Sequence, residues 1–594
     1  MKMTNLELAE LLRRIAAAYE ILGENRFRII AYTRAADSIE HLTSELKDYW
    51  DNKRLREIPG VGDMLAGHID EMFRTGHSKH FDSVMAKLPT SIYPLLLVPG
   101  IGPKKAYKLV TVLKLKNEKT VISDLEHAAK KHKIAPIEGF GEKSEELILS
   151  NIAIYRKGQI KENRMTLPVA DGIAADIIAF IRRVPSVKRV DVLGSLRRQV
   201  ATIGDIDIAV ATANPKEVIA HFVAYPHQEI IEEGPTGASL RLHNGRQVDL
   251  RVQKSGRYGA MLQYFTGSKN HNIALRSFAL SKGLSLSEYG IKHVRTGKID
   301  TYATEEAFYN ALGLPYIPPE LREDKGEIQA AIRGSLPKLV DIKDVMGDVH
   351  LHTDYNLEPS HDLGMDSFTA LLDRAAELHY EYIGLSDHNP SITNHSEKQI
   401  VAIMKRRKEY YEQQYSSWEK KTHKRVKYVL MCEVDILPDG KLALSDAALE
   451  YVDAVIASVH SSFTQERRIV TKRIVRAIES NPKVRILGHP TGRLLSKREG
   501  IDADWGEVFR ACKTHDIALE INSYPDRLDL PDTLVFDAIK SGLRFCINTD
   551  SHAADHMNLM QYGVSVARRG WATKDDIVNT LSYNKFKSWL LKGA

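Results

Sequence analysis

The chain has 594 residues, of which 43% are hydrophobic and 27% are charged, so its composition is that of an ordinary globular protein with several domains. No apolar run approaches the roughly 20 residues that a membrane span needs, and we expect no membrane partner. The net charge of +6 permits a polyanionic partner without requiring one, and three cysteines without metal or disulfide spacing favour a reducing cytoplasm.

The first 160 residues predict helices joined by glycine turns. Two turns are repeats: IPGVGDMLAGHI (58–69) and VPGIGPKKAYKL (98–109) each lead from Pro-Gly-x-Gly into a helical pattern. Such a turn exposes backbone N–H groups that suit a phosphate. For either copy alone, a tight turn between helices is an equally good explanation, and a solvated helix face explains the lysines of the second copy.

The two repeated turns resemble the helix-hairpin-helix motif, which grips nucleic-acid backbone without reading sequence. The resemblance implies DNA contacts at Gly60, Gly62, Gly100, Gly102 and Lys104. It also makes a monovalent cation a candidate cofactor at the turns.

A β-rich region follows, in which GDIDIAV (204–210) places Asp205 and Asp207 on alternate residues. A strand sends alternate side chains to opposite faces, so both carboxylates share the face away from the core. RQVDLRV places Asp249 on a second alternating strand. Solvated aspartates on an edge strand are the ordinary explanation. Three acids on neighbouring strands would instead bind two divalent cations about 4 Å apart, a geometry suited to in-line phosphoryl transfer.

The pattern GS…GDID…VDLR resembles the nucleotidyltransferase superfamily, and LQYFTGSKNHNIALRSFALSKGLSLSEYGI (262–291) resembles the family X DNA polymerases. The resemblance covers roughly residues 1–320 and implies Mg²⁺ or Mn²⁺ on Asp205, Asp207 and Asp249. It places the nucleotide at Arg164, Gly194, Ser195, Arg198, Gly204, Tyr264, Phe265, Gly267 and Asn272, and the template at Arg276. Ordinary core packing is the alternative for the Tyr-Phe pair.

After residue 348, apolar strand-like runs alternate with helical patterns, which predicts βαβ units and a mainly parallel sheet. Seven runs end in a residue that can bind a metal: GDVHLH, YIGLSDH, YVLMCEVD, AVIASVH, VRILGHP, IALEIN and LRFCINTDSH. In a βα barrel the carboxyl ends of the strands form one face. A single histidine at a strand end is usually structural, whereas seven such ends together suit Zn²⁺ or Mn²⁺.

This set resembles the PHP domain, a metal-dependent (βα)7 phosphoesterase barrel, over about 345–585. The resemblance implies one metal on His350, His352, Glu433 and Asp550, a second on Glu433, His460 and His489, and a third helped by His388 and His552. The first motif departs from the family pattern, because Leu357 stands where an acid is expected. We predict that the next residue, Glu358, completes the third site, with Asp354 as a second candidate. A site with two metals and reduced activity is the alternative.

The resemblances imply a multidomain α+β and α/β chain. Its expected parts are a helix-hairpin-helix domain (1–90), a fingers-like helix-hairpin-helix domain (91–163), a nucleotidyltransferase palm with a mixed sheet (164–255), a dNTP-selection subdomain (256–318), a linker (319–344) and a (βα)7 PHP barrel (345–594).

This layout is that of bacterial and archaeal family X polymerases. It implies a cytoplasmic, monomeric enzyme that uses dNTPs and gapped or primer–template DNA in base excision repair. A 3′→5′ exonuclease with two or three Mn²⁺ or Zn²⁺ ions would occupy the PHP barrel. The alternatives are a polymerase whose barrel is only structural, a barrel that acts as a phosphatase or AP-endonuclease-like phosphoesterase, and a DNA-binding protein without catalysis.

Overall fold

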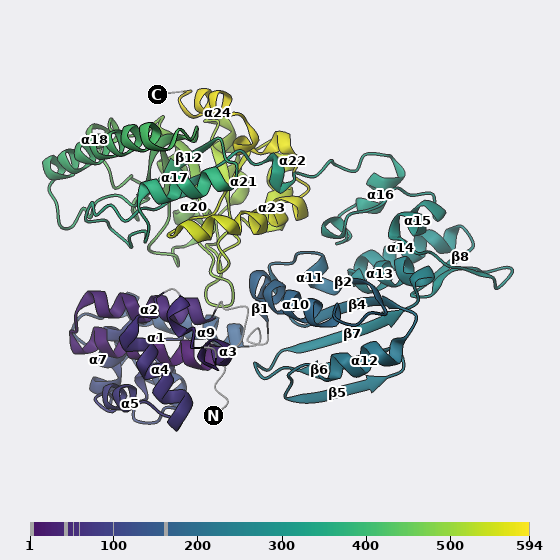
Figure 1. The fold of residues 1–594 in the computed structure, drawn as a ribbon. Coiled ribbons are helices and arrows are strands. Elements are labelled where there is room, and N and C mark those ends of the chain that lie inside the picture. Colours follow the sequence, from purple (N-terminus) through teal and green to yellow (C-terminus); the bar gives the residue numbers. More distant parts are fainter. Residues whose placement is uncertain are drawn as a thin grey trace.

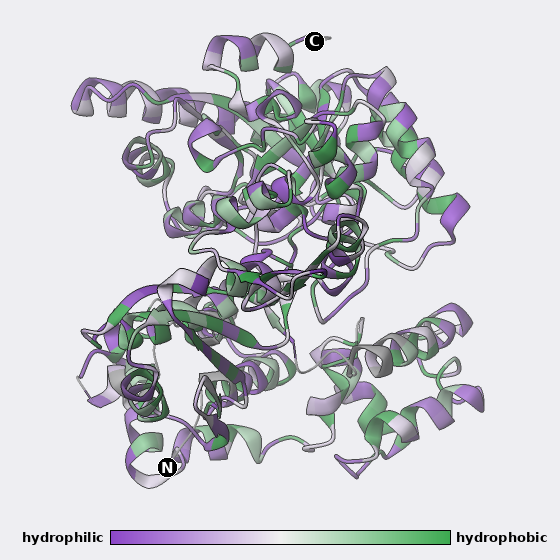
Figure 2. Ribbon diagram, turned by 90° about the vertical axis from the view of Figure 1, so that its right-hand side faces the viewer, coloured by the Kyte–Doolittle hydropathy of each residue, from purple (hydrophilic) through white to green (hydrophobic). Residues whose placement is uncertain are grey.

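The computed structural model describes residues 5–40, 46–51, 53–58, 60–98, 100–159 and 164–592. Figure 1 shows the N-terminal helices, a mixed sheet with its helices and a C-terminal barrel as three groups of elements. In Figure 2 the hydrophobic residues concentrate on the central strands, while the outer helices carry hydrophilic faces. No helix in these ranges is long and apolar enough to cross a membrane.

The N-terminal helices pack around one apolar core that includes Leu12, Ile69 and Leu109. They are α1 (Asn5–Leu22), α2 (Arg26–Glu40), α3 (Leu46–Asp51), α4 (Asp63–Thr75), α5 (Lys79–Met85), α6 (Ile92–Leu95), α7 (Pro103–Leu113), α8 (Val121–Lys130) and α9 (Glu142–Gln159). Gly60 and Gly100 have φ of +84° and +78°, which side-chain-bearing residues rarely adopt. The repeated turns therefore share a backbone conformation, although Pro59 and Pro99 lie outside the described residues.

A five-stranded mixed sheet follows in the order β2-β4-β7-β6-β5. Its elements are α10 (Leu167–Ile181), β2 (Val187–Val192), α11 (Gly194–Arg197), β4 (Ile206–Thr212), α12 (Pro215–Val223), β5 (Glu229–Gly234), β6 (Gly237–Arg241) and β7 (Gln247–Gln253), and β1 (Met165–Thr166) pairs separately with β3 (Thr202–Ile203). Ile206 and Ile208 are buried in the core that α10 and α12 share, as the alternation predicts. Ala209 and Ala211 pack on the other face, with residues of α13 (Tyr258–Thr266).

The next elements form a small helical and β unit. They are α13 (Tyr258–Thr266), α14 (Lys269–Ser281), β8 (Leu284–Ser287), β9 (Gly290–His293), β10 (Ile299–Asp300), α15 (Glu305–Ala311), η3 (Pro319–Leu321) and α16 (Glu327–Ile332). The stretch 319–344, expected as a linker, is folded into this unit, because Leu321 and Ile328 belong to its core. Within this stretch, Arg322 is fully buried and pairs with Glu305 at 2.7 Å.

The C-terminal part contains a seven-stranded parallel sheet in sequence order within residues 347–548. Its strands are β11 (Gly347–Leu351), β12 (Tyr382–Leu385), β13 (Lys427–Asp435), β14 (Ala454–Ser458), β15 (Val484–Gly488), β16 (Ala518–Asn522) and β17 (Phe545–Asn548). Its longer helices are α17 (Phe368–Glu377), α18 (Glu397–Thr422), α20 (Arg467–Ser480), α21 (Trp505–Thr514), α22 (Asp532–Lys540), α23 (Met560–Arg569) and α24 (Tyr583–Leu590). A bridge between Leu351 and Ser551 joins the first strand to the segment just after the last strand and nearly closes the barrel.

Candidate active sites

Three carboxylates meet on adjacent strands of the mixed sheet. Strands β4 and β7 are parallel, and their register places Asp207 opposite Asp249. Together with Asp205, these residues each offer an oxygen within 4.8 Å of the others. Asp249 is buried and accepts hydrogen bonds from Ser239 and Gln247. The site therefore has the oxygen ligands that hard divalent cations prefer.

Electrostatics also fit a cation at this place. Burial, together with the negative charges of Asp205 and Asp249, raises the pKa of Asp207 to about 7. The positive charges of Arg251 and Arg198 only partly oppose this rise. A divalent cation between the carboxylates would remove the repulsion that raises the pKa.

The turn before the aspartate strand lies against the same carboxylate. Gly194 has φ of +57°, and a β-carbon there would overlap the side chain of Asp207. Ser195 follows it within the short helix α11. Arg198 is mostly buried, and its Nη1 donates to the Thr266 carbonyl at 2.6 Å. Glycine is therefore required for the close approach of turn and carboxylate.

Arg164 is exposed, and its Nε donates to the Thr202 hydroxyl at 2.9 Å. A β-carbon at Gly204 would lie 3.3 Å from the guanidinium of Arg164. The structure thus brings Arg164 close to Gly204, the residue that precedes Asp205 in the sequence.

The YFTGS segment ends α13. Tyr264 and Phe265 are half-buried and meet edge to face at 5.1 Å, so they combine packing with partial exposure. Gly267 has φ of +69° and approaches Arg198. The side chain of Asn272 donates to the Tyr264 carbonyl at 2.7 Å and accepts from Gln263. Its amide is thus used within the protein.

The residues expected to touch DNA are exposed in the structure. Gly62 and Gly102 immediately precede α4 and α7, and Lys104 is exposed in the first turn of α7. Arg276 is exposed on α14, where its Nε donates to the Asn272 carbonyl at 3.2 Å.

Glu433 is the centre of the barrel site. Its Oε2 lies 3.3 Å from His350 Nε2, 3.6 Å from His352 Nε2 and 2.9 Å from His388 Nδ1. Its Oε1 lies 2.8 Å from His489 Nε2 and 3.3 Å from His460 Nε2. The two oxygens thus face two groups of imidazoles. This arrangement suits a carboxylate that bridges two metals.

Asp550 completes the first group, with Oδ1 3.1 Å from His352 Nε2. Four buried atoms that face neighbouring ligands make no hydrogen bond of normal geometry to the described residues, although some lie close to one another: His350 Nε2, His388 Nδ1, Glu433 Oε2 and His552 Nε2. Buried polar atoms are rarely left in this state, so the donor set fits metal ions well.

The structure does not bring Glu358 to this cluster. Its side chain is exposed and lies 3.2 Å from His395 Nε2, because the backbone at residue 358 turns with φ of +51°. Asp362 lies there instead, 3.5 Å from His388 Nε2 and 3.5 Å from His552 Nε2. The loop after β11 therefore presents a different carboxylate from the one that we expected.

Two further acids hold the histidines. Glu520 is fully buried in β16, and its Oε1 lies 2.6 Å from His350 Nδ1. Asp435 Oδ1 lies 2.7 Å from His460 Nδ1 and 3.0 Å from His361 Nε2. Carboxylates of this kind fix the tautomer and orientation of metal-binding histidines. The sequence signal for Glu520 is that a charged residue stands inside the apolar strand IALEIN (517–522).

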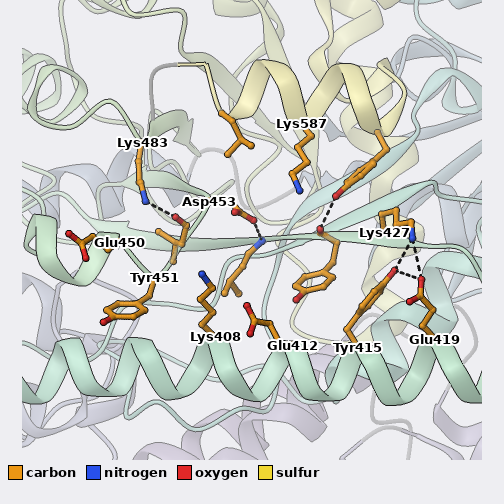
Figure 3. A pocket seen from close by; sticks show the side chains of 15 residues that line it. Lys408, Glu412, Tyr415, Glu419, Lys427, Glu450, Tyr451, Asp453, Lys483 and Lys587 are labelled. Atoms are coloured by element: carbon orange, nitrogen blue, oxygen red, sulfur yellow. Dashed lines mark hydrogen bonds and ion pairs between the residues drawn. The ribbon is translucent and has the colours of Figure 1, made fainter.

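A cavity of about 470 Å³ lies at the opposite end of the barrel (Figure 3). It is lined by α18 and by the amino ends of β13 to β15. Lys427 contacts Glu419 at 3.2 Å there, and Lys483 donates to the Val452 carbonyl at 2.9 Å. The ligand-type histidines lie at the carboxyl ends of the same strands, so this cavity is separate from the metal cluster.

A nucleotidyltransferase joined in one chain to a PHP-type metal barrel is the class of protein that these two sites and their folds define. Family models match at residues 3–78 (helix-hairpin-helix domain), 261–323 (DNA polymerase beta thumb) and 348–524 (PHP domain). DNA polymerase/3′-5′ exonuclease PolX of Bacillus subtilis is 32% identical over 591 residues, 99% of both chains. The chain belongs to the PolX family of DNA polymerases.

More distant relatives match only part of the chain. DNA polymerase lambda of Rattus norvegicus is 22% identical over 54% of this chain and 56% of its own length. DNA polymerase lambda of Arabidopsis thaliana is 25% identical over 54% of this chain and 62% of its own length.

Proposed function

We propose that this chain is a DNA-directed DNA polymerase that fills short gaps during base excision repair and carries a metal-dependent 3′→5′ exonuclease in its barrel. One observation supports the polymerase activity most strongly: the oxygens of Asp205, Asp207 and Asp249 converge within 4.8 Å beside a glycine turn. Its substrates are dNTPs and gapped or primer–template DNA. A cytoplasmic location, a monomeric state and a monovalent cation at the hairpin turns stay predictions.

At the polymerase site, Asp205, Asp207 and Asp249 would hold Mg²⁺ or Mn²⁺. Bound there, the two ions supply activation of the attacking hydroxyl and charge stabilisation of the leaving pyrophosphate. Arg164, Ser195 and Arg198 orient the triphosphate, because charged and hydroxyl donors suit phosphate oxygens. The remaining nucleotide contacts are assigned to Gly194, Gly204, Tyr264, Phe265, Gly267 and Asn272.

At the barrel site, Mn²⁺ or Zn²⁺ suits the mixed nitrogen and oxygen donors. The first metal is assigned to His350, His352, Glu433 and Asp550, the second to Glu433, His460 and His489, and the third to His388, His552 and Asp362. Bound there, the ions supply a nucleophile from water and stabilise the leaving oxygen of a phosphodiester. Glu520 and Asp435 keep the ring nitrogens of their histidines aimed at the cluster. A purely structural barrel is disfavoured by the buried ligand atoms without hydrogen-bond partners.

The test is a gapped primer–template incubated with Mn²⁺, first with dNTPs and then without them. We expect primer extension in the first case and 3′ shortening in the second. Asp205→Ala with Asp207→Ala should abolish extension and leave shortening, and His350→Ala with His352→Ala should do the reverse. Loss of both activities from either folded pair would contradict two separate sites. A phosphatase or AP-endonuclease barrel would instead release phosphate or incise at abasic sites.

A further inference from the structure

Arg569, the last residue of α23, is one of the barrel residues that contact the polymerase part. Arg569 Nη1 donates to the Arg198 carbonyl at 2.7 Å and to Glu323 Oε1 at 3.0 Å. Its Nη2 donates to Asp532 on α22 at 3.0 Å, which fixes the guanidinium on the barrel side. The side chain of Arg569 is 7% exposed, so these contacts are shielded from water.

The same carboxylate of Glu323 holds Arg198. Arg198 Nε donates to Glu323 Oε1 at 2.9 Å, while Nη1 is held by the Thr266 carbonyl at 2.6 Å. Among the described residues, Nη2 of Arg198 has no hydrogen-bond partner, which leaves it for an anion. One carboxylate oxygen thus links an arginine of the polymerase to an arginine of the barrel.

A second contact of the barrel is made with Gln199, the residue after Arg198. The hydroxyl of Ser565, one helical turn before Arg569 on α23, donates to Gln199 Oε1 at 3.0 Å. Gln199 has φ of +56°, which an L side chain rarely adopts. The barrel helix therefore contacts the backbone and side chains of the segment that follows α11.

These charges depend on each other because they are largely buried. Arg198 and Glu323 are 14% and 21% exposed, and removing one member of such a network leaves the others uncompensated. Without Arg569, Glu323 would lose a partner and would be free to turn to water. Arg198 would then keep only its carbonyl contact and would sample several positions.

We propose that Arg569 of the barrel is a positioning residue for nucleotide binding, acting on Arg198 through Glu323. The inference rests on the proposed polymerase function, in which Arg198 contacts the triphosphate. It makes dNTP binding depend on the docking of the exonuclease barrel.

The test compares Arg569→Met with Arg568→Met in the full chain. Arg568 is the matched control, since it lies on the same helix and interface but pairs with Glu320 at 2.7 Å and with the Val340 carbonyl. We expect Arg569→Met to raise the KM for dNTP on the order of tenfold, with a smaller change in kcat and an unchanged 3′→5′ rate. Arg568→Met should change the KM less than about twofold. Equal effects of both variants would mean that a loosened interface, not positioning, is responsible.

A double-mutant cycle tests the route through Glu323. In a Glu323→Gln background, Arg569→Met should add less than about twofold to the KM, because the link is already broken. Compared with Arg569→Met, Arg569→Lys should restore part of the dNTP affinity, because its charge can still pair with Glu323. The restoration should be incomplete, because one ammonium cannot reach all three partners of Arg569. Full additivity, or an unchanged KM in Arg569→Met, would overturn the inference. Absence of extension by the parent chain would overturn the proposed function instead.

Discussion

Asp207 lies between two other carboxylates, and its burial and their charges raise its pKa to about 7. Below that pH the metal-free side chain is largely protonated, and a metal ion has to displace the proton. Metal binding at such a site is therefore linked to pH. The same reasoning does not extend to a solvated aspartate, whose pKa stays near 4.

We predict that the Mn²⁺ concentration for half-maximal primer extension falls as pH rises, by about tenfold per unit up to about pH 7, and then levels off. The sign follows from the raised pKa, because deprotonation frees the ligand. The measurement is primer extension titrated with Mn²⁺ between about pH 5.5 and 8.5. The KM for dNTP at saturating Mn²⁺ serves as the control, and a requirement for Mn²⁺ that is independent of pH would contradict the prediction.

At the third barrel site, only one of two acids in the same loop approaches the histidines. Asp362 lies 3.5 Å from both His388 and His552, whereas Glu358 pairs with His395. We therefore predict that Asp362→Asn loses one metal and slows 3′ shortening by about tenfold to a hundredfold. Glu358→Gln is the matched control and should keep the metal count and the rate. Metal analysis and a 3′→5′ exonuclease assay of both variants test this prediction. Loss of metal only in Glu358→Gln would show that Glu358, not Asp362, is the ligand.

At the level of elements, the two hairpin turns differ in the helices that they precede. Helix α4 begins with Asp63, whose carboxylate contacts Arg56 at 2.7 Å. Helix α7 begins with Pro103 and carries the exposed Lys104 and Lys105 in its first turn. A carboxylate at a helix start competes with a phosphate for the backbone N–H groups, whereas lysines add attraction. The second turn is thus better suited to DNA.

We predict that Lys104→Ala with Lys105→Ala weakens binding to gapped DNA and lowers the slope of log affinity against log salt by about 1 to 2. The reason is that each phosphate contact releases counterions. Lys116→Ala with Lys119→Ala removes the same charge from exposed positions away from the turn and serves as the control. Fluorescence anisotropy at several salt concentrations measures both. Identical slopes for the two double variants would point to net charge alone.

At the level of the whole molecule, the two metal sites lie in different folding units that share a buried interface. Besides Arg569, Tyr562 on α23 donates to Asp171 on α10 at 3.3 Å. Trp571 packs against the core that contains Leu321. The barrel and the polymerase are thus joined through side chains rather than through a loose connection.

We predict that a chelator lowers the thermal midpoint of the barrel by roughly 5–10 °C, because metal binds only the folded cluster. Differential scanning calorimetry with and without EDTA measures the shift. The double variant Asp205→Ala/Asp207→Ala should still show the EDTA-induced shift. The double variant His350→Ala/His352→Ala should show no such shift. A shift of the same size in the histidine variant would place the stabilising metal elsewhere.

The sequence by itself determined the features that follow from strand periodicity. Alternation put Asp205 and Asp207 on one face, and each of the seven apolar runs forms a parallel strand whose carboxyl end carries its polar residue. Parallel strands place these ends on one edge, so the clustering of His350, Glu433 and Asp550 needed no knowledge of loops.

Only the tertiary structure decided which loop acid reaches the third site and what the barrel touches. Local periodicity does not define the path of the loop that turns Glu358 outward and Asp362 inward. The sequence predicts a linker over 319–344, but the stretch is packed, and some of its partners lie far along the chain. The contact of Glu323 with Arg569 spans 246 positions, and Glu305 pairs with Arg197, 108 positions away, as well as with the buried Arg322. Such pairs depend on how whole elements pack, which no short pattern of residues records.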